Sequence, residues 1–145
     1  SQVVCYSRIK AKDSPIKGLP SLLMISISEN VHYIRRVRFI NNEPVAVQDM
    51  YIPENRIPIS DLKVMEHSFF NYVEKVLHLK IDNGSTQVRI VLPDKEIQNY
   101  LKIADEEPVA LIEHLSYLNN RLPFELSRSY QNYRRFGISY VNKYL

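Results

Sequence analysis

The chain has 145 residues, near the common size of one compact domain, and 45% of them are hydrophobic, so we expect a single domain over 1–145. Its formal net charge is only +3, whereas a domain that binds DNA by itself usually carries a denser basic stripe. A single cysteine excludes an internal disulfide, and no apolar run approaches the roughly 20 residues that cross a bilayer. We therefore expect a cytoplasmic protein without metal, cofactor or membrane contact.

Alternating apolar and polar residues predict three strands in the first part of the chain, over 3–11, 32–40 and 45–51. Cys5 lies in the first of them, and we expect its thiol to be buried and inert. The stretch 19–28 is apolar without a clean period and predicts a short helix or a turn. Asn41-Asn42-Glu43-Pro44 is a turn sequence, so residues 33–51 should form a hairpin.

The second part of the chain begins with a change to helical spacing, carried by Met65, Phe69, Tyr72, Val73 and Val76. We expect this helix to begin near Ser68, a favoured N-cap, and its unit to end at Asn83-Gly84.

Three strands over 86–92, 109–118 and 122–131 follow, with a short helix capped by Asp94 and a tight hairpin at Asn119-Asn120. Residues 136–140 are a candidate last strand. Hairpins with helices between them predict an α+β fold, in which helices cover one face of an antiparallel sheet.

The most informative local feature is Arg36-Val37-Arg38. A period of two places both guanidinium groups on one side of a strand, where like charges repel unless an anion lies between them. A phosphate or carboxylate would accept paired bonds from such arginines. The alternatives are a solvated face and neutralisation by acidic side chains such as Glu54 or Asp61.

Other polar residues allow two interpretations. A helix that begins at Ser68 would offer free N–H groups and a hydroxyl to an anion, but an ordinary N-cap explains the serine equally well. The strand face of Glu125, Ser127 and Ser129 is either the solvent side or the lining of a pocket. His114 near Glu125 is more often structural than catalytic. The chain has no glycine-rich phosphate loop and no G-x-S-x-G motif, so we expect no enzyme.

Several motifs together resemble the UTRA domain found in the HutC branch of GntR-type bacterial transcription regulators. Arg36-Val37-Arg38, Asn41-Asn42-Glu43-Pro44 and Tyr51-Ile52-Pro53 are similar to the family pattern R-x-R, D-G-E-P and Y-x-P. Residues 67–74 resemble the family's serine-initiated helix, 107–110 its strand entry, and 122–130 its closing strand. These matches cover nearly the whole chain in the family's order.

The resemblance implies a chorismate-lyase-like fold, an antiparallel sheet with helices packed on it, that binds a metabolite and catalyses nothing. In members that sense phosphosugars, two arginines and the helix-start serine hold the phosphate, and these match Arg36, Arg38 and Ser68. The glutamate of the closing strand contacts sugar hydroxyls and matches Glu125. The aromatic residue two positions after the serine matches Phe70.

Two substitutions depart from the family pattern. Gln48 stands where sugar-sensing relatives often have an acidic residue, and Phe70 replaces a common tyrosine. Gln48 would share a face with Arg36 only if the loop 41–43 held an odd number of residues, because a two-residue loop pairs Arg36 with Val47. We expect both residues to contact the ligand, which could be a hexosamine phosphate, a disaccharide phosphate or a small organic acid.

The resemblance also implies partners. We expect a homodimer, and DNA binding only through a winged-helix domain upstream of this chain, together with a ligand-covering loop that the chain begins too late to contain. Two rival functions remain. One is a chorismate-lyase-like enzyme that uses Arg36 and Arg38 to hold a dicarboxylate and Glu125 as an acid, and the other is a dimerisation module without a ligand.

Overall fold

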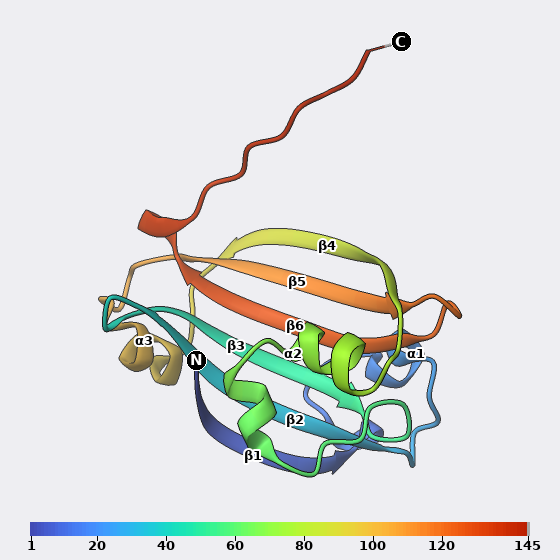
Figure 1. Ribbon diagram of the computed structural model, residues 1–145. Coiled ribbons are helices and arrows are strands. Elements are labelled where there is room, and N and C mark those ends of the chain that lie inside the picture. The colour runs from blue at the N-terminus through green and yellow to red at the C-terminus, as the bar shows by residue number, and fades with distance from the viewer. Residues whose placement is uncertain (145) are drawn as a thin grey trace.

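The computed structural model describes residues 1–144 as one six-stranded antiparallel sheet in the order β1-β2-β3-β6-β5-β4 (Figure 1). The strands are β1 Gln2–Lys10, β2 Asn30–Ile40, β3 Glu43–Pro53, β4 Ile81–Val91, β5 Val109–Leu118 and β6 Pro123–Asn132. Hairpins join β2 to β3 and β5 to β6, and the pairing of β3 with β6 unites the two halves. The predicted α+β fold is confirmed.

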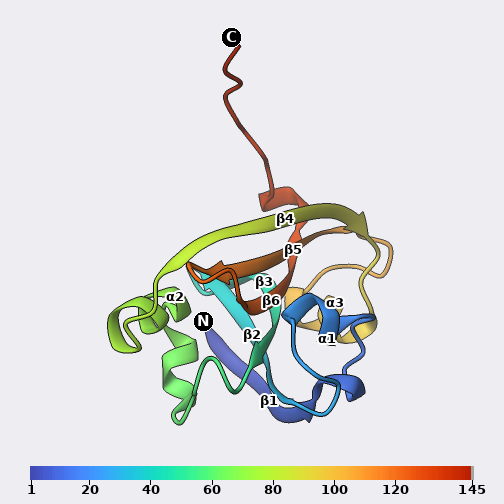
Figure 2. The ribbon, with the colours of Figure 1, turned by 90° about the vertical axis from the view of Figure 1, so that its right-hand side faces the viewer.

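Helices cover both faces of the sheet, so the expectation of one covered face was wrong (Figure 2). The helices are α1 Leu19–Leu23, α2 Phe69–Asn71, which continues as a π-helical turn Tyr72–Val76, and α3 Lys95–Leu101. Short 3-10 turns lie at Ala11–Asp13, Leu62–Glu66 and Tyr133–Arg135. Among residues 1–144, no helix has the length and apolar character needed to cross a bilayer.

The two faces bury different core clusters. On one face, Phe69 and Val73 of the α2 segment pack with Met50 of β3. On the other, Leu23 of α1 packs near Tyr51, the next residue of the same strand. Successive side chains of a strand point to opposite faces, and each fully buried large apolar side chain contributes roughly 1.5–3 kcal/mol. Sheet and helices are therefore held together from both sides.

The β2–β3 turn sets the register that the site depends on. Asn41 and Asn42 both have positive φ, 50° and 64°, as a two-residue turn of the hairpin type requires. The pairing then shifts between Arg38 and Phe39, which leaves Val45 as a bulge, and Arg36 faces Gln48. The expected condition of an odd loop was therefore wrong, because the bulge supplies the extra residue instead.

Four further local predictions need correction. Gly84 lies inside β4, next to a bulge that begins at Ile81, and does not end a unit. The β5–β6 hairpin was expected to turn at Asn119-Asn120, but the residue with positive φ in this loop is Arg121, at 69°. The side chain of Asn120 instead accepts a hydrogen bond from the Leu122 N–H. Cys5 is exposed because β1 is an edge strand.

The fourth correction concerns the last predicted strand. Residues 136–140 are extended but join no strand within the described part of the chain, because β6 is already flanked by β3 and β5.

Candidate functional site

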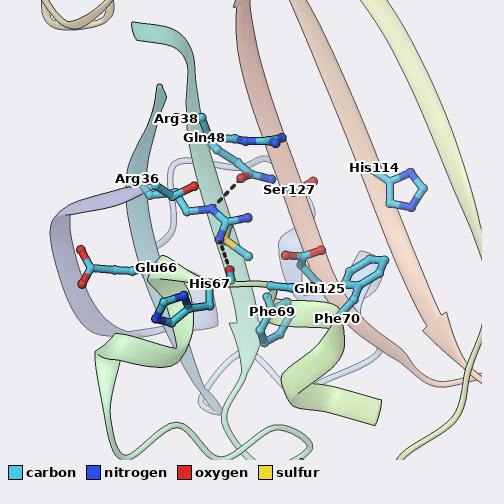
Figure 3. A pocket seen from close by; sticks show the side chains of 13 residues that line it. Arg36, Arg38, Gln48, Glu66, His67, Phe69, Phe70, His114, Glu125 and Ser127 are labelled. Carbon is cyan, nitrogen blue, oxygen red and sulfur yellow. Dashed lines mark hydrogen bonds between the residues drawn. The ribbon is translucent and has the colours of Figure 1, made fainter. Parts of the chain in front are cut away.

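A pocket of about 550 Å³ opens on the α2 side of the sheet, between β2, β3, β5, β6 and the start of α2 (Figure 3). All six residues that the sequence suggested for the site line this pocket: Arg36, Arg38, Gln48, Ser68, Phe70 and Glu125. They come from strands and a helix start that are up to about 90 positions apart in the chain. The fold brings them together because alternate residues of β2, β3 and β6 point to this face.

Arg36 lies at the centre of the site and is held by neutral acceptors. Its Nε donates to Oε1 of Gln48 at 2.7 Å, and its Nη1 donates to the carbonyl of Met65 at 2.7 Å and that of His67 at 3.4 Å. Burial lowers the pKa of Arg36, a nearby carboxyl group at Glu125 raises it, and Arg38 lowers it. Within residues 1–144, its Nη2 makes no hydrogen bond, so that end of the guanidinium is available to a ligand.

Arg38 is exposed at the mouth of the same pocket, two residues further along β2. In the described structure it forms no ion pair and no side-chain hydrogen bond. The two carboxylates considered as its neutralising partners are engaged elsewhere. Glu54 pairs with Arg8 at 2.6 Å, and Asp61 accepts a bond from the Lys63 N–H at 2.9 Å. The positive charge of the pocket is therefore not cancelled by either of them.

Ser68 is the N-cap of α2, as expected. Its Oγ accepts a hydrogen bond from the Asn71 N–H at 3.2 Å, which leaves the hydroxyl hydrogen free to donate into the pocket. Phe70 stands beside Ser68 and is 39% exposed, with its ring centroid 5.7 Å from that of Phe124. The start of α2 thus offers one polar group and one aromatic surface to the same cavity.

Glu125 and Ser127 of β6 form the floor of the pocket, on a buried polar strand face that continues to Ser129. Glu125, Ser127 and Ser129 of β6 are 3%, 6% and 8% exposed, so the alternative of a solvent-facing strand was wrong for these residues. Burial raises the pKa of Glu125 to about 7, although Arg36 acts in the opposite direction. At neutral pH this carboxyl group therefore exchanges between a form that only accepts hydrogen bonds and one that also donates.

Further residues also line the pocket, among them Glu66 and His67, which the sequence did not single out, and His114. His114 had been considered only as a neighbour of Glu125. Its Nδ1 lies 2.6 Å from Oγ1 of Thr86 in a hydrogen bond, and its ring lies over Gly84. A Cβ at Gly84 would come within 2.7 Å of Nε2, so the ring occupies the space that a side chain there would need. A glycine inside a strand was the sequence signal for such a close approach.

The described part of the chain contains no group of three His, Cys, Asp or Glu side chains suited to hold a metal ion. The pocket offers hydrogen bonding and charge: the guanidinium of Arg36 at its centre and that of Arg38 at its mouth, buried oxygens on the floor, and an aromatic ring at the side (Figure 3). Such an arrangement can bind a small anionic molecule that also carries hydroxyl groups.

Known proteins similar to this chain are transcription regulators. It is 29% identical over 128 residues to HTH-type transcriptional regulator GmuR of Bacillus subtilis (strain 168), covering 88% of this chain and 54% of the relative. It is 27% identical over 129 residues to the mannosyl-D-glycerate transport/metabolism system repressor MngR of Escherichia coli (strain K12), covering 89% and 52%. The chain thus spans about half the length of these curated relatives.

Solved structures share the fold, and a family model identifies it. YydK of Bacillus subtilis, described as a possible transcriptional regulator, superposes with a TM-score of 0.87 at 24% identity, over 97% of this chain and 61% of that one. The effector domain of PhnF from Mycobacterium smegmatis gives 0.85 at 18% identity, over 99% and 86%. The model of the UTRA domain matches residues 9–136. This chain therefore belongs to the UTRA domain family, whose relatives here are transcription regulators.

Proposed function

We propose that the chain is the single effector-sensing domain of a GntR-family transcription regulator and that its pocket binds a small phosphorylated metabolite, a sugar phosphate. The observation that carries the proposal is the state of Arg36 and Arg38. Both line one pocket; within residues 1–144 the side-chain hydrogen bonds of Arg36 go to neutral acceptors alone, and Arg38 makes none. Arg36 is half-buried without a hydrogen-bonded carboxylate among the described residues, and the partial loss of solvent around such a cation is costly, a cost that a bound phosphate would offset.

The phosphate end of the ligand would lie between the two arginines and Ser68. The free Nη2 of Arg36, the guanidinium of Arg38 and the hydroxyl of Ser68 are all donors, and a phosphate group offers only acceptors. Charge-assisted bonds of this kind are about twice as strong as neutral ones. A neutral sugar would use these donors poorly, so we expect free sugars to bind weakly.

The remainder of the ligand would lie along the floor. Glu125 and Ser127 both donate and accept near neutral pH, and the amide of Gln48 has an NH₂ group left after its oxygen accepts from Arg36. These groups match the hydroxyls of a sugar. The ring of Phe70 would pack against its apolar face. A cavity of about 550 Å³ is in the range of pockets that bind small metabolites.

The regulatory role concerns the parent protein. We propose that it is a cytoplasmic homodimer that binds DNA through a separate domain, and that the ligand favours one arrangement of the paired DNA-binding parts. A ligand shifts such an equilibrium only by its difference in affinity for the two states. The name of MngR refers to mannosyl-D-glycerate, so phosphorylated glycosides belong among the ligands to be tested.

The test is a thermal-shift and calorimetric screen of the domain against glucose 6-phosphate, glucosamine 6-phosphate, a phosphorylated disaccharide, inorganic phosphate, free glucose and chorismate. A ligand at about 100 times its Kd should add about 2.7 kcal/mol of stability. Arg38→Met should weaken binding roughly thirtyfold, which corresponds to the loss of about 2 kcal/mol for a charged hydrogen bond, and should leave the melting temperature unchanged without ligand.

Lys17→Met is the matched control, because Lys17 is an exposed cation in the loop before α1, on the other face of the sheet. It should bind as the wild type does. Turnover of chorismate would replace the proposal with the enzyme alternative. If no anionic compound binds, or if Arg38→Met binds normally, the pocket is not the phosphate site.

A further inference from the structure

Residues 136–144 form an extended segment that the rest of the chain does not cover. Figures 1 and 2 show it leaving the end of β6 and projecting away from the sheet. Its apolar side chains are strongly exposed, with Ile138 at 63%, Tyr140 at 76% and Val141 at 93%. Isoleucine, tyrosine and valine are residues that favour strands, and their exposure to water is unfavourable. The segment therefore has the composition of a strand without a partner.

The direction of this segment is held at its base. Asn132 caps the turn Tyr133–Arg135 by accepting a bond from the Arg134 N–H at 3.0 Å. Arg134 pairs with Glu107 at 3.4 Å, and Arg135 pairs with Glu43 at 2.8 Å. These contacts connect the turn to the start of β3 and to the residues before β5, and they point the segment outward. It cannot add to its own sheet beside β6, whose two neighbours are β3 and β5.

The sheet has two edges, and they differ. At the β1 edge, the Val3 N–H already donates to Glu66, and the 3-10 turn Leu62–Glu66 packs against the strand. The β4 edge has no such cover in the described structure. β4 is 11 residues long and exposed over most of its length, and Ile90 is 63% exposed. A long open edge of this kind readily accepts another strand.

We propose that residues 136–144 of one copy pair with the β4 edge of a second copy, so that each sheet gains a strand from its partner. The inference rests on the homodimer proposed above and is independent of the ligand. A segment of this length spans about 30 Å when extended, and β4 spans about 36 Å, so the segment covers most of the edge. Two identical exchanges related by a twofold axis close the assembly and leave neither β4 edge open.

The first test is the association of the wild-type domain measured by sedimentation. Tyr140→Glu should weaken the dimer by a factor on the order of thirty, because it places a charge in the new strand pair. It should not change the stability of a single copy, since Tyr140 is already 76% exposed there. Ile27→Glu is the control, because Ile27 is an exposed apolar residue, 63% accessible, in the loop before β2.

The second test identifies the edge. Three variants are made in a Cys5→Ser background: Ile138→Cys, Ile90→Cys on β4, and Ser7→Cys on β1. The Ile138→Cys domain is mixed with each of the other two and treated with a short bis-maleimide. We expect it to be linked to Ile90→Cys chains and not to Ser7→Cys chains. A dimer that tolerates Tyr140→Glu or links to β1 overturns this inference and leaves the homodimer standing. If the wild-type domain stays monomeric at about 100 times the concentration used in the binding assays, the strand exchange and the proposed homodimer are both overturned.

Discussion

Arg35 and Arg36 are neighbours on β2, but they lie on opposite faces of the sheet and in opposite electrostatic surroundings. Arg35 donates two hydrogen bonds to the carboxylate of Asp49, at 2.7 and 2.8 Å, and also pairs with Glu96 at 3.1 Å. Arg36 donates to the amide oxygen of Gln48 and to backbone carbonyls. The arginine on one face is therefore paired with carboxylates, whereas the arginine on the other face has no hydrogen-bonded carboxylate in the described part of the chain.

The cause of the difference is the residue that each arginine meets across the strand pair. The register places Arg35 opposite Asp49 and Arg36 opposite Gln48. The carboxylate of Asp49 accepts both hydrogen bonds from Arg35, and its Oδ1 also accepts one from the Tyr33 hydroxyl at 2.9 Å. The three side chains therefore form one hydrogen-bonded network. The pKa of Arg35 is raised, chiefly by its bond to Asp49, whereas burial lowers that of Arg36. We infer that one face is built for stability and the other for a ligand.

The largest effect should come from breaking the structural face. Asp49→Asn leaves Arg35 half-buried with only the exposed Glu96 as a charged partner, and we expect the free energy of unfolding to fall by about 3 kcal/mol. Urea denaturation measures it. Asp105→Asn is the control, because its pair with Lys95 is about 73% exposed and should contribute less than about 1 kcal/mol. Equal losses in the two variants would contradict the assignment of Arg35 and Asp49 to a structural role.

The next effect concerns the ligand face and depends on pH. The folded pKa of Glu125, about 7, lies above the ordinary value of 4.5, so the folded state binds the proton more tightly than the unfolded state does. Its stabilising contribution is complete below pH 4.5 and is lost as the pH rises to about 7, by about 3 kcal/mol in total. Glu125→Gln should remove this slope. Unfolding free energies at pH 5 and pH 8 measure it, and a wild-type-to-variant difference that is the same at both values would refute it.

The smallest effect concerns the wall of the pocket, where Gly84 lies against His114. Gly84→Ala brings a Cβ within 2.7 Å of the His114 ring and 2.9 Å of the Leu115 carbonyl oxygen, so the ring and the strand backbone must both shift, at a cost of about 2 kcal/mol. Chemical-shift changes of the His114 ring would report the movement. Gly137→Ala is the control, since nothing lies within 4 Å of a Cβ there. If phosphate-ligand affinity changes in Gly84→Ala but not in Gly137→Ala, His114 is part of the binding wall.

Some features of this molecule were predictable because they depend on near neighbours in the chain. The Asn41-Asn42 turn, the N-caps at Ser68 and Asp94, and the shared face of Arg36 and Arg38 all follow from local backbone geometry and from hydrogen bonds to residues three positions away. The family motifs then suggested six of the residues that line the pocket.

Other features depended on residues far apart in the chain. The bulge at Val45 brought Gln48 to Arg36, and a two-residue turn alone would have placed Val47 there. Cys5 is exposed because β1 lies at the edge, and residues 136–140 remain unpaired because β6 already has two neighbours.

The sequence by itself determined the strand periods, the caps and the side of β2 that carries the two arginines, because each depends on the backbone of a few consecutive residues. Only the tertiary structure decided which charges are cancelled. The pairing of Arg35 with Asp49, and the burial that raises the pKa of Glu125, arise from strands that meet across the sheet. Register and burial are properties of the assembled sheet, and no short stretch of the chain contains them.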